Sequence, residues 1–253
     1  EAAWGVSVWR EMRVRRIFRD GREREVHAEK TARGELGPFA GAAGFWIEGA
    51  ARVDVGGLLD AAAARWRANG QARVGPVELG RELDRYDLVV DCRGAAGAGD
   101  PRWRAVPWEF SKGETRELKV AGLAPGVIVN RGHWLLPVGP GVAWVGATHE
   151  PGKTDTTVTT PARTALEASA IALVGKGKFE VSGQFAGVRV NLPDKRPVVG
   201  RHASVVRLGL INGLGARGVS LAPMLARHWV NHLTEGVPFD AEVDVARFGR
   251  GTA

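Results

Sequence analysis

Two segments of this chain share an order that restricts the fold strongly: a short apolar strand that runs directly into a glycine-rich turn. In the first, residues 86–92 lead into residues 93–99. In the second, residues 205–211 lead into residues 212–218, and a helical pattern follows over residues 221–233. Glycines let a turn approach a ligand closely, and a helix that begins after such a turn offers unpaired N–H groups to an anionic group. The order strand, glycine turn, helix is typical of α/β domains that bind nucleotides.

The region between these two segments predicts a different architecture. Four short strands, separated by Gly and Pro, are expected over residues 116–120, 126–129, 133–137 and 143–147. This pattern indicates an antiparallel sheet. We therefore predict a mixed α/β (α+β) chain, in which a partial Rossmann-like domain is interleaved with an antiparallel β-rich domain.

Local signals predict the remaining elements. Alternation around Asp20-Gly21 predicts a β-hairpin over residues 8–30, and residues 34–44 read as a loop. A helix is expected from Asp54 to the stop at Asn69-Gly70. A second helix is expected over residues 161–174 with Thr160 as its N-cap, and residues 244–253 read as a tail.

Composition excludes several classes of protein. The 253 residues include a single cysteine, Cys92, which cannot form an internal disulfide and which we expect to be buried on a strand. His133, His149 and His202 do not have ligand spacing, so we expect no metal site. No apolar segment approaches the roughly 20 residues of a membrane span, and no secretion signal opens the chain, so we expect a cytoplasmic protein without a membrane partner. The net charge of +7 is dispersed, which permits a nucleic-acid partner without requiring one.

The stretch before the second glycine turn carries a family signature. Gly187, Arg189, Asp194, Pro197 and Gly200 follow an aromatic residue in a fixed order. Together with the second turn, this resembles the closing signature of FAD-dependent amine and amino-acid oxidases of the D-amino-acid oxidase and glycine oxidase type, the DAO family. Three further matches, which extend the resemblance over about residues 45–240, are Lys112-Gly113-Glu114, Gly146-Ala147-Thr148 and residues 87–94.

The resemblance implies a cofactor and a site. FAD would lie across the α/β domain, with Gly94 and Ala95 near the dinucleotide. The residues implied near the flavin ring are Gly213, Leu214, Gly215, Ala216, Arg217 and Gly218. Arg189 would pair with the substrate carboxylate, for which a planar guanidinium is suited; the alternative is a surface ion pair with Asp194. Trp134 lies where many members carry a substrate-binding Tyr. The reaction would oxidise the C–N bond of a small amino acid or secondary amine by hydride transfer to the flavin.

The same resemblance implies five sequence regions. Residues 1–45 and 105–190 would form the β-rich substrate domain, residues 46–104 and 191–240 the FAD-binding domain, and residues 241–253 a tail.

Two departures from the family pattern accompany these matches. The Gly-x-Gly-x-x-Gly strand and its acidic partner are absent, because residues 94–99 read Gly-Ala-Ala-Gly-Ala-Gly. We therefore expect a truncated chain that binds FAD poorly by itself. In addition, Leu214 stands where relatives often carry His.

Two alternatives remain open. Residues 213–223 also resemble the FAD-dependent half of the bifunctional bacterial enzyme that completes 5-methylaminomethyl-2-thiouridine in tRNA, for which tRNA would be the partner. The other alternative is a cofactor-free structural or binding domain. The oligomeric state cannot be predicted from the sequence.

Overall fold

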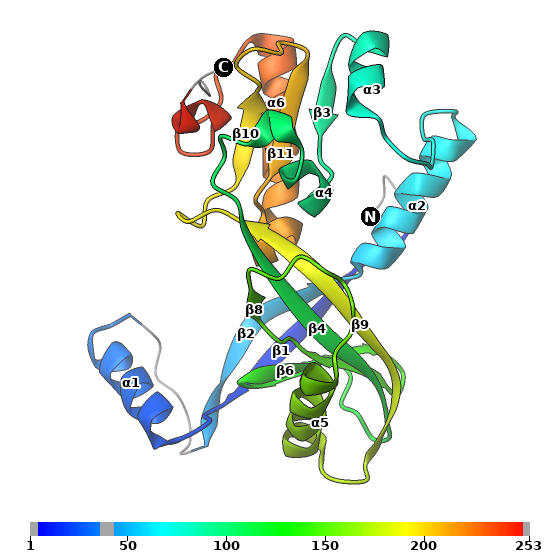
Figure 1. Cartoon of the computed structure of the whole chain (residues 1–253). Helices are drawn as coiled ribbons and strands as arrows, with labels where there is room; N and C mark the ends of the chain where they lie inside the picture. The colour runs from blue at the N-terminus through cyan, green and yellow to red at the C-terminus, as the bar shows by residue number, and fades with distance from the viewer. Residues whose placement is uncertain (1–4, 36–42, 250–253) are drawn as a thin grey trace. The chain divides into compact units, whose positions relative to one another are not determined.

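The computed structural model describes residues 5–35 and 43–249, which divide into two compact units (Figure 1). Unit 1 comprises Glu1–Ala68, Glu114–His149 and Thr157–Ala186. Unit 2 comprises Asn69–Gly113, Glu150–Thr156 and Gly187–Ala253. Each unit therefore collects segments that are far apart in the sequence, as expected for an interleaved α/β chain.

The strands of unit 1 belong to the larger sheet. Its strands run in the order β2 (Gly44–Val53), β1 (Trp9–Ile17), β5 (Val127–Arg131), β6 (His133–Gly139), β7 (Val142–Gly146), β4 (Glu109–Val120) and β8 (Glu150–Pro151), and β9 (Phe179–Asn191) also pairs with β4. Neighbours β5–β6, β6–β7 and β4–β7 are antiparallel. The four strands predicted between residues 116 and 147 are confirmed as β4 to β7, with β4 longer than expected.

Helix α5 (Thr160–Val174) closes the core of unit 1. Leu118, Leu135 and Val145 of the sheet pack with Leu166 of this helix, and all four are buried. The N-cap is Thr159, whose hydroxyl accepts the Ala162 N–H at 3.3 Å. The predicted cap at Thr160 is thus wrong by one residue, because Thr159 has the extended backbone that a cap residue adopts.

The predicted hairpin around Asp20 is wrong. After β1 the chain forms helix α1 (Gly21–Ala32), which lies at the end of the β1–β2 pair in Figure 1. Asp20 accepts the Glu23 N–H at 2.8 Å, and Glu23 accepts the Arg19 N–H at 2.7 Å. These two bonds start a helix where a turn was expected. Of the predicted loop 34–44, residues 36–42 lie outside the described residues and residue 44 begins β2.

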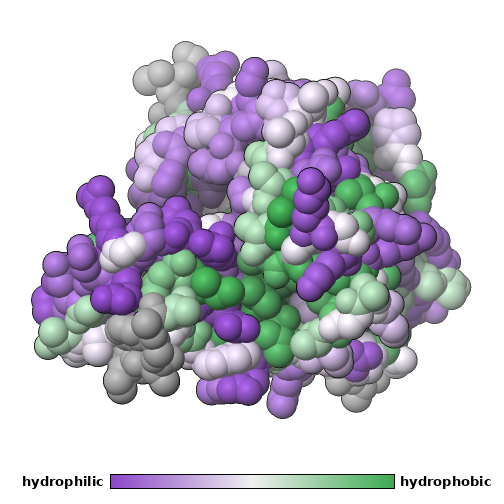
Figure 2. All heavy atoms as spheres, turned by 90° about the horizontal axis from the view of Figure 1, so that it is seen from below, coloured by the Kyte–Doolittle hydropathy of each residue, from purple (hydrophilic) through white to green (hydrophobic). Residues whose placement is uncertain are grey.

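The predicted helix after Asp54 is confirmed as α2 (Val55–Ala68). In Figure 2, apolar residues gather near the middle of the visible face and hydrophilic residues surround them. Trp9, Leu59 and Phe185 of unit 1 are at least half exposed. No helix among the described residues combines the length and apolar character needed to cross a membrane.

The smaller sheet organises unit 2. Strand β11 (Leu208–Asn212) lies between β10 (Val198–Arg201), to which it is antiparallel, and β3 (Val89–Asp91), to which it is parallel. The other elements of unit 2 are α3 (Leu79–Arg85), α4 (Ala95–Ala98), η1 (Pro101–Trp103), η2 (Gly215–Arg217), α6 (Gly218–Glu235) and η3 (Val245–Phe248). The two predicted strand and glycine-turn segments are therefore neighbours in one sheet.

Unit 2 has two hydrophobic clusters. Leu225 and Trp229 of α6 pack with Val199, while Trp103 and Val245 belong to the second cluster. The prediction of a tail from residue 244 is wrong for its first part, because Val245 is buried and begins η3. Residues 250–253 lie outside the described residues.

Cys92 is exposed, so the prediction of a buried thiol is wrong. The reason is the length of the strand: β3 ends at Asp91, and Cys92 belongs to the connection that follows it.

Candidate functional site

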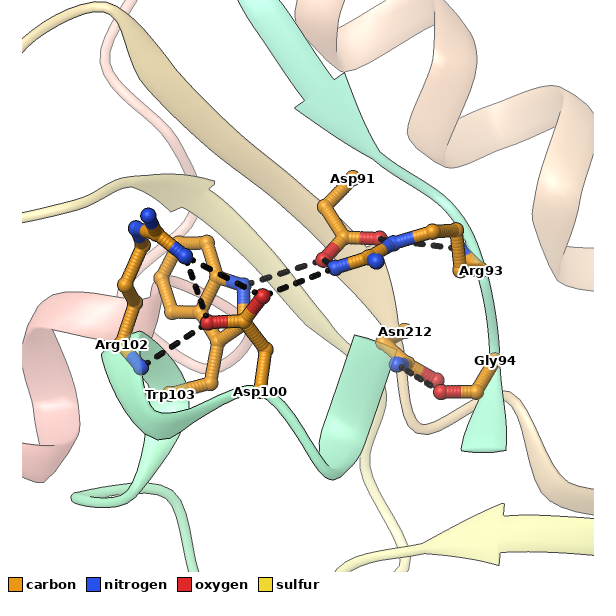
Figure 3. Close-up of polar contacts among 7 residues, drawn as sticks. All are labelled: Asp91, Arg93, Gly94, Asp100, Arg102, Trp103 and Asn212. Atoms are coloured by element: carbon orange, nitrogen blue, oxygen red, sulfur yellow. Dashed lines mark hydrogen bonds and ion pairs between the residues drawn. The ribbon is translucent and has the colours of Figure 1, made fainter. Parts of the chain in front are cut away.

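The two glycine turns meet at one edge of the small sheet in unit 2. Because β3 and β11 are parallel neighbours, their carboxyl ends, and the turns that follow them, lie at the same edge. The Asn212 amide at the end of β11 donates a 2.8 Å hydrogen bond to the carbonyl of Gly94 (Figure 3). The structure therefore brings together Gly94 and Ala95 with residues 213–218, the two groups implied separately by the sequence.

A buried carboxylate shapes the first turn. Asp91 accepts hydrogen bonds from the backbone N–H of Arg93 and from its guanidinium at 2.8–3.0 Å, and from the Trp103 indole at 3.3 Å (Figure 3). Burial alone would raise the pKa of the Asp91 carboxyl, but the hydrogen bonds and positive charge of Arg93 lower this pKa below its ordinary value. Asp91 is thus an ionised anchor for the residues after β3.

The same network continues beyond the turn. The Arg93 guanidinium also pairs with Asp100 at 3.1 Å, and Asp100 accepts from Arg102 at 3.1 Å. A Cβ at Gly97 would lie 2.8 Å from the Asp91 carboxylate, so this position has no room for a side chain. The first turn is therefore held in one conformation by side chains on both sides of it.

Close contacts with β9 and the residue after it restrict the second turn. Gly213 has φ +71°, and a Cβ there would lie 2.2 Å from Leu192. Gly215 has φ +55°, and its Cβ would lie 2.1 Å from the side-chain oxygen of Asn191. Both positions need glycine for backbone conformation and for space.

The second turn leads into the N-terminus of α6. No side chain caps this terminus, for which Arg217 is the N-cap, or the preceding turn η2, for which Leu214 is the N-cap. Ala216 and Arg217 are exposed, and the Arg217 guanidinium donates to the Lys195 carbonyl. An uncapped N-terminus of an 18-residue helix presents N–H donors and a partial positive charge. This chemistry fits the electron-rich N1 and O2 edge of a flavin ring.

Arg189 lies on β9 without an acidic partner among the described residues of unit 2. Its guanidinium lies against Gly113 of β4, where a Cβ would come within 2.4 Å of one terminal nitrogen and 2.5 Å of the other. The alternative ion pair with Asp194 is wrong, because Asp194 pairs with Arg247 at 3.3 Å.

The end of β9 connects Arg189 to the second glycine turn. Asn191, two residues further along the strand, lies on the same face as Arg189 and against Gly215. Beside Gly113, the buried Lys112 pairs with Asp155 at 2.8 Å, which fixes this part of β4. Arg189 thus places a cation near the proposed flavin edge, with its guanidinium packed against Gly113.

Trp134 lies in unit 1, on β6. It pairs across the sheet with Gly146, and its indole would lie 3.1 Å from a Cβ at that glycine. Its role in substrate binding stays a prediction.

The sequence alone did not reveal the contacts of Gly113 and Asn191. Gly113 was noticed only as part of the Lys-Gly-Glu motif, and Asn191 received no role. Only the pairing of β4 with β9, together with the path of the chain after β11, could have identified them.

Comparison with known proteins identifies the family. The model of the DAO family, described as FAD dependent oxidoreductase, matches residues 5–231. Over 177 residues, 66% of this chain, the sequence is 34% identical to the tRNA 5-methylaminomethyl-2-thiouridine biosynthesis bifunctional protein MnmC of Maricaulis maris (strain MCS10). The match covers 29% of that relative, so this chain spans under a third of its length.

Solved structures show the same fold. Glycine oxidase from Geobacillus kaustophilus aligns with a TM-score of 0.74 at 20% identity, over 96% of this chain and 76% of that one. Iminodiacetate oxidase from Chelativorans sp. BNC1 aligns with a TM-score of 0.72 at 20% identity, over 96% of this chain and 78% of that one. The chain belongs to the DAO family of FAD-dependent oxidoreductases, and its cofactor is FAD.

Proposed function

We propose that this chain oxidises the C–N bond of a small amino acid or a secondary amine that carries a carboxylate. The observation that carries the proposal is Arg189. Its guanidinium lies against Gly113 and has no acidic partner among the described residues of unit 2, and Arg189 shares its face of β9 with Asn191 beside the second glycine turn. A planar guanidinium in that position would hold a carboxylate by two parallel hydrogen bonds.

The protein's part in this reaction is binding and orientation. When bound, FAD would supply the redox chemistry by accepting a hydride from the carbon next to nitrogen, while the nitrogen loses a proton and the resulting imine is hydrolysed by water. Gly94 and Ala95 would lie along the dinucleotide. The backbone N–H groups of residues 214–216 and of the first turn of α6 would donate to the flavin edge, and the glycines at 213 and 215 would allow the ring to approach. The Arg217 N–H donates instead to the Leu214 carbonyl at 3.0 Å. Arg189 would fix the substrate carbon relative to that ring.

A second candidate is the modification of a wobble uridine in tRNA. It is favoured by the 34% identity to the bifunctional protein of Maricaulis maris and by the net charge of +7. In this case the carboxylate held by Arg189 would belong to a carboxymethylaminomethyl group on the base. The chemistry at the C–N bond would be the same, and only the size of the substrate would differ.

The test begins with flavin binding. Purified protein would be mixed with FAD, and bound flavin measured from the visible spectrum after gel filtration. The loaded protein would then be screened for oxygen consumption and for reduction of an artificial acceptor with glycine, sarcosine, iminodiacetate and undermodified tRNA. Turnover of the small amines supports the first candidate, and turnover of tRNA alone supports the second.

The residue test compares two arginines of unit 2. Arg189→Met should raise the KM for a carboxylate-bearing substrate by roughly 30- to 150-fold, the equivalent of about 2–3 kcal/mol of charged hydrogen bonding. Arg207→Met removes the same charge from the exposed connection between β10 and β11 and should leave KM unchanged. Equal KM values for the Arg189 variant and the parent would exclude Arg189 from substrate binding, and absence of bound flavin would contradict both candidates.

A further inference from the structure

Unit 2 contains a cavity of about 700 Å³ that belongs to neither glycine turn. Its wall includes Arg201, the last residue of β10, and His202, which follows it in the connection to β11. The second glycine turn follows the opposite end of the same strand. The volume lies within the range of roughly 300–1,000 Å³ that is typical of small-molecule sites.

The cavity wall combines aromatic rings with three arginines, Arg102, Arg104 and Arg201. The rings come from Trp103, Phe239 and Phe248, together with the imidazoles of His202 and His232. The His232 and Phe239 rings lie 4.4 Å apart and are tilted by only 30°. Such a wall suits a planar ring, because aromatic faces stack on each other.

Arg201 supplies the cation. Its Nε donates to His232 Nε2 at 3.1 Å, and its Nη1 donates to the Val206 carbonyl at 2.9 Å. Both acceptors are neutral, and the described residues of unit 2 offer this guanidinium no carboxylate. Its charge is therefore held in place and left without a counter-charge.

The hydrogen bonds also show that the two histidines add no charge to the wall. His232 Nε2 accepts from Arg201, so its proton lies on Nδ1, which contacts the Val237 carbonyl at 3.0 Å. His202 Nδ1 accepts the backbone N–H groups of Ser204 and Val205 at 3.1 and 3.0 Å, so its proton lies on Nε2. Both rings are neutral in this arrangement.

The other charged groups of the wall have local partners. Arg102 pairs with Asp100, Arg104 also has a partner within the chain, and the Asp244 carboxylate accepts the Ala246 N–H at 2.9 Å as the cap of η3. Arg201, which lies over the Trp229 ring at 5.7 Å, has no carboxylate partner among the described residues of unit 2 and offers its charge to an anion beside the rings.

We propose that this cavity is a second ligand site that binds a nucleoside phosphate, with the base against the aromatic wall and the phosphate on Arg201. A nucleoside phosphate joins a planar heterocycle and an anion in one molecule of suitable size. The same chemistry is present in a free nucleotide and at the phosphorylated end of an RNA. The site is separate from the proposed amine oxidation.

The test is calorimetric titration of the purified protein with GMP. GMP should bind with one site per chain, and guanosine and inorganic phosphate should each bind at least tenfold more weakly. Arg201→Gln should weaken GMP binding by at least tenfold. Ala203→Trp, which fills the cavity and keeps Arg201, should weaken it to the same extent. Arg207→Gln, the matched control outside the cavity wall, should change the Kd by less than twofold.

Three outcomes would overturn the proposal. In the first, millimolar GMP produces no heat of binding. In the second, Arg201→Gln and Arg207→Gln weaken GMP binding equally. In the third, FAD displaces GMP and Arg201→Gln does not change GMP binding. The last result would place GMP in the flavin site. A comparison of 5′-phosphorylated and 5′-hydroxyl RNA trinucleotides then separates the sources: tighter binding of the phosphorylated trinucleotide than of GMP assigns the site to an RNA end, and the reverse assigns it to a free nucleotide.

Discussion

Replacing Gly113 by alanine tests whether the packing of Arg189 matters for substrate binding. The new Cβ would lie 2.4 Å and 2.5 Å from the two terminal nitrogens of Arg189. Since ordinary contacts of this kind need roughly 3.5 Å, the guanidinium would have to move by about 1 Å. The backbone would not resist the change, because Gly113 lies within β4 and does not have a positive φ.

The expected rise in KM follows from the hydrogen bonds between Arg189 and the substrate carboxylate. A guanidinium displaced by this much can keep one of two parallel bonds to a carboxylate but not both. Loss of one charged hydrogen bond costs about 1.5 kcal/mol at the low end of its usual range, which is a rise in KM of roughly 10-fold and less than the rise expected for Arg189→Met. Folding stability should stay the same or increase by up to about 1 kcal/mol, because alanine is favoured over glycine within a strand.

The assay is steady-state oxidation of the amine with the highest turnover, together with spectral titration of the flavin-loaded protein with glycolate. Gly187→Ala is the matched control, because Gly187 lies on β9 near Arg189 and a Cβ there meets nothing within 4 Å. A KM for Gly113→Ala within twofold of the parent would refute the packing argument. If Arg189→Met also had no effect, the proposed carboxylate site itself would be wrong.

Three further substitutions test other parts of the two units. Gly215→Ala should weaken FAD binding by at least tenfold in a flavin fluorescence titration, because the Cβ would overlap the Asn191 side chain. Asp91→Asn should destabilise the protein at pH 7 by about 2–3 kcal/mol in a urea titration. Because the pKa of Asp91 is lowered by folding, its ionised carboxylate stabilises the protein fully above about pH 4, and this stabilisation is lost as the pH falls through the folded-state pKa. The Asp91→Asn variant should therefore lose less stability than the parent between about pH 4 and pH 2. Glu114→Ala should cost about 2–4 kcal/mol in the same assay, because this buried carboxylate accepts hydrogen bonds from Thr159 and Gln184; no change would show that the cap of α5 does not depend on it.

The parts of the fold that could be predicted from the sequence depend on local signals. Helix α2 and strands β4 to β7 follow from short-range patterns that tertiary contacts did not override. The hairpin around Asp20 was wrong although its correction was also local: Asp20 and Glu23 have the spacing of a capping box. The Asp20-Gly21 pair is compatible with a turn and with a helix start, and the hydrogen bond that Glu23 accepts from Arg19 favours the helix.

The candidate site depended on contacts that no local pattern contains. The Arg189 side chain packs on Gly113 because β4 and β9 are paired, and the sequence does not show this pairing. The burial of Val245 was missed for the same reason, since a short polar segment reads as a tail until its contact partners in the core are known.

In the proposed flavin site of unit 2, glycines define the edge more than side chains do. One hydrogen bond, from Asn212 to the Gly94 carbonyl, joins the two turns, and the φ of 58° at Gly94 is a conformation that also favours glycine. In the proposed site, the donors to the flavin would be backbone N–H groups of the second turn and of the start of α6, which do not depend on side-chain identity. The constraint is instead the space beside Leu192 and Asn191, which only glycine leaves free at positions 213 and 215. Hence Leu214, which replaces the His found in many relatives, removes no donor on which this arrangement depends.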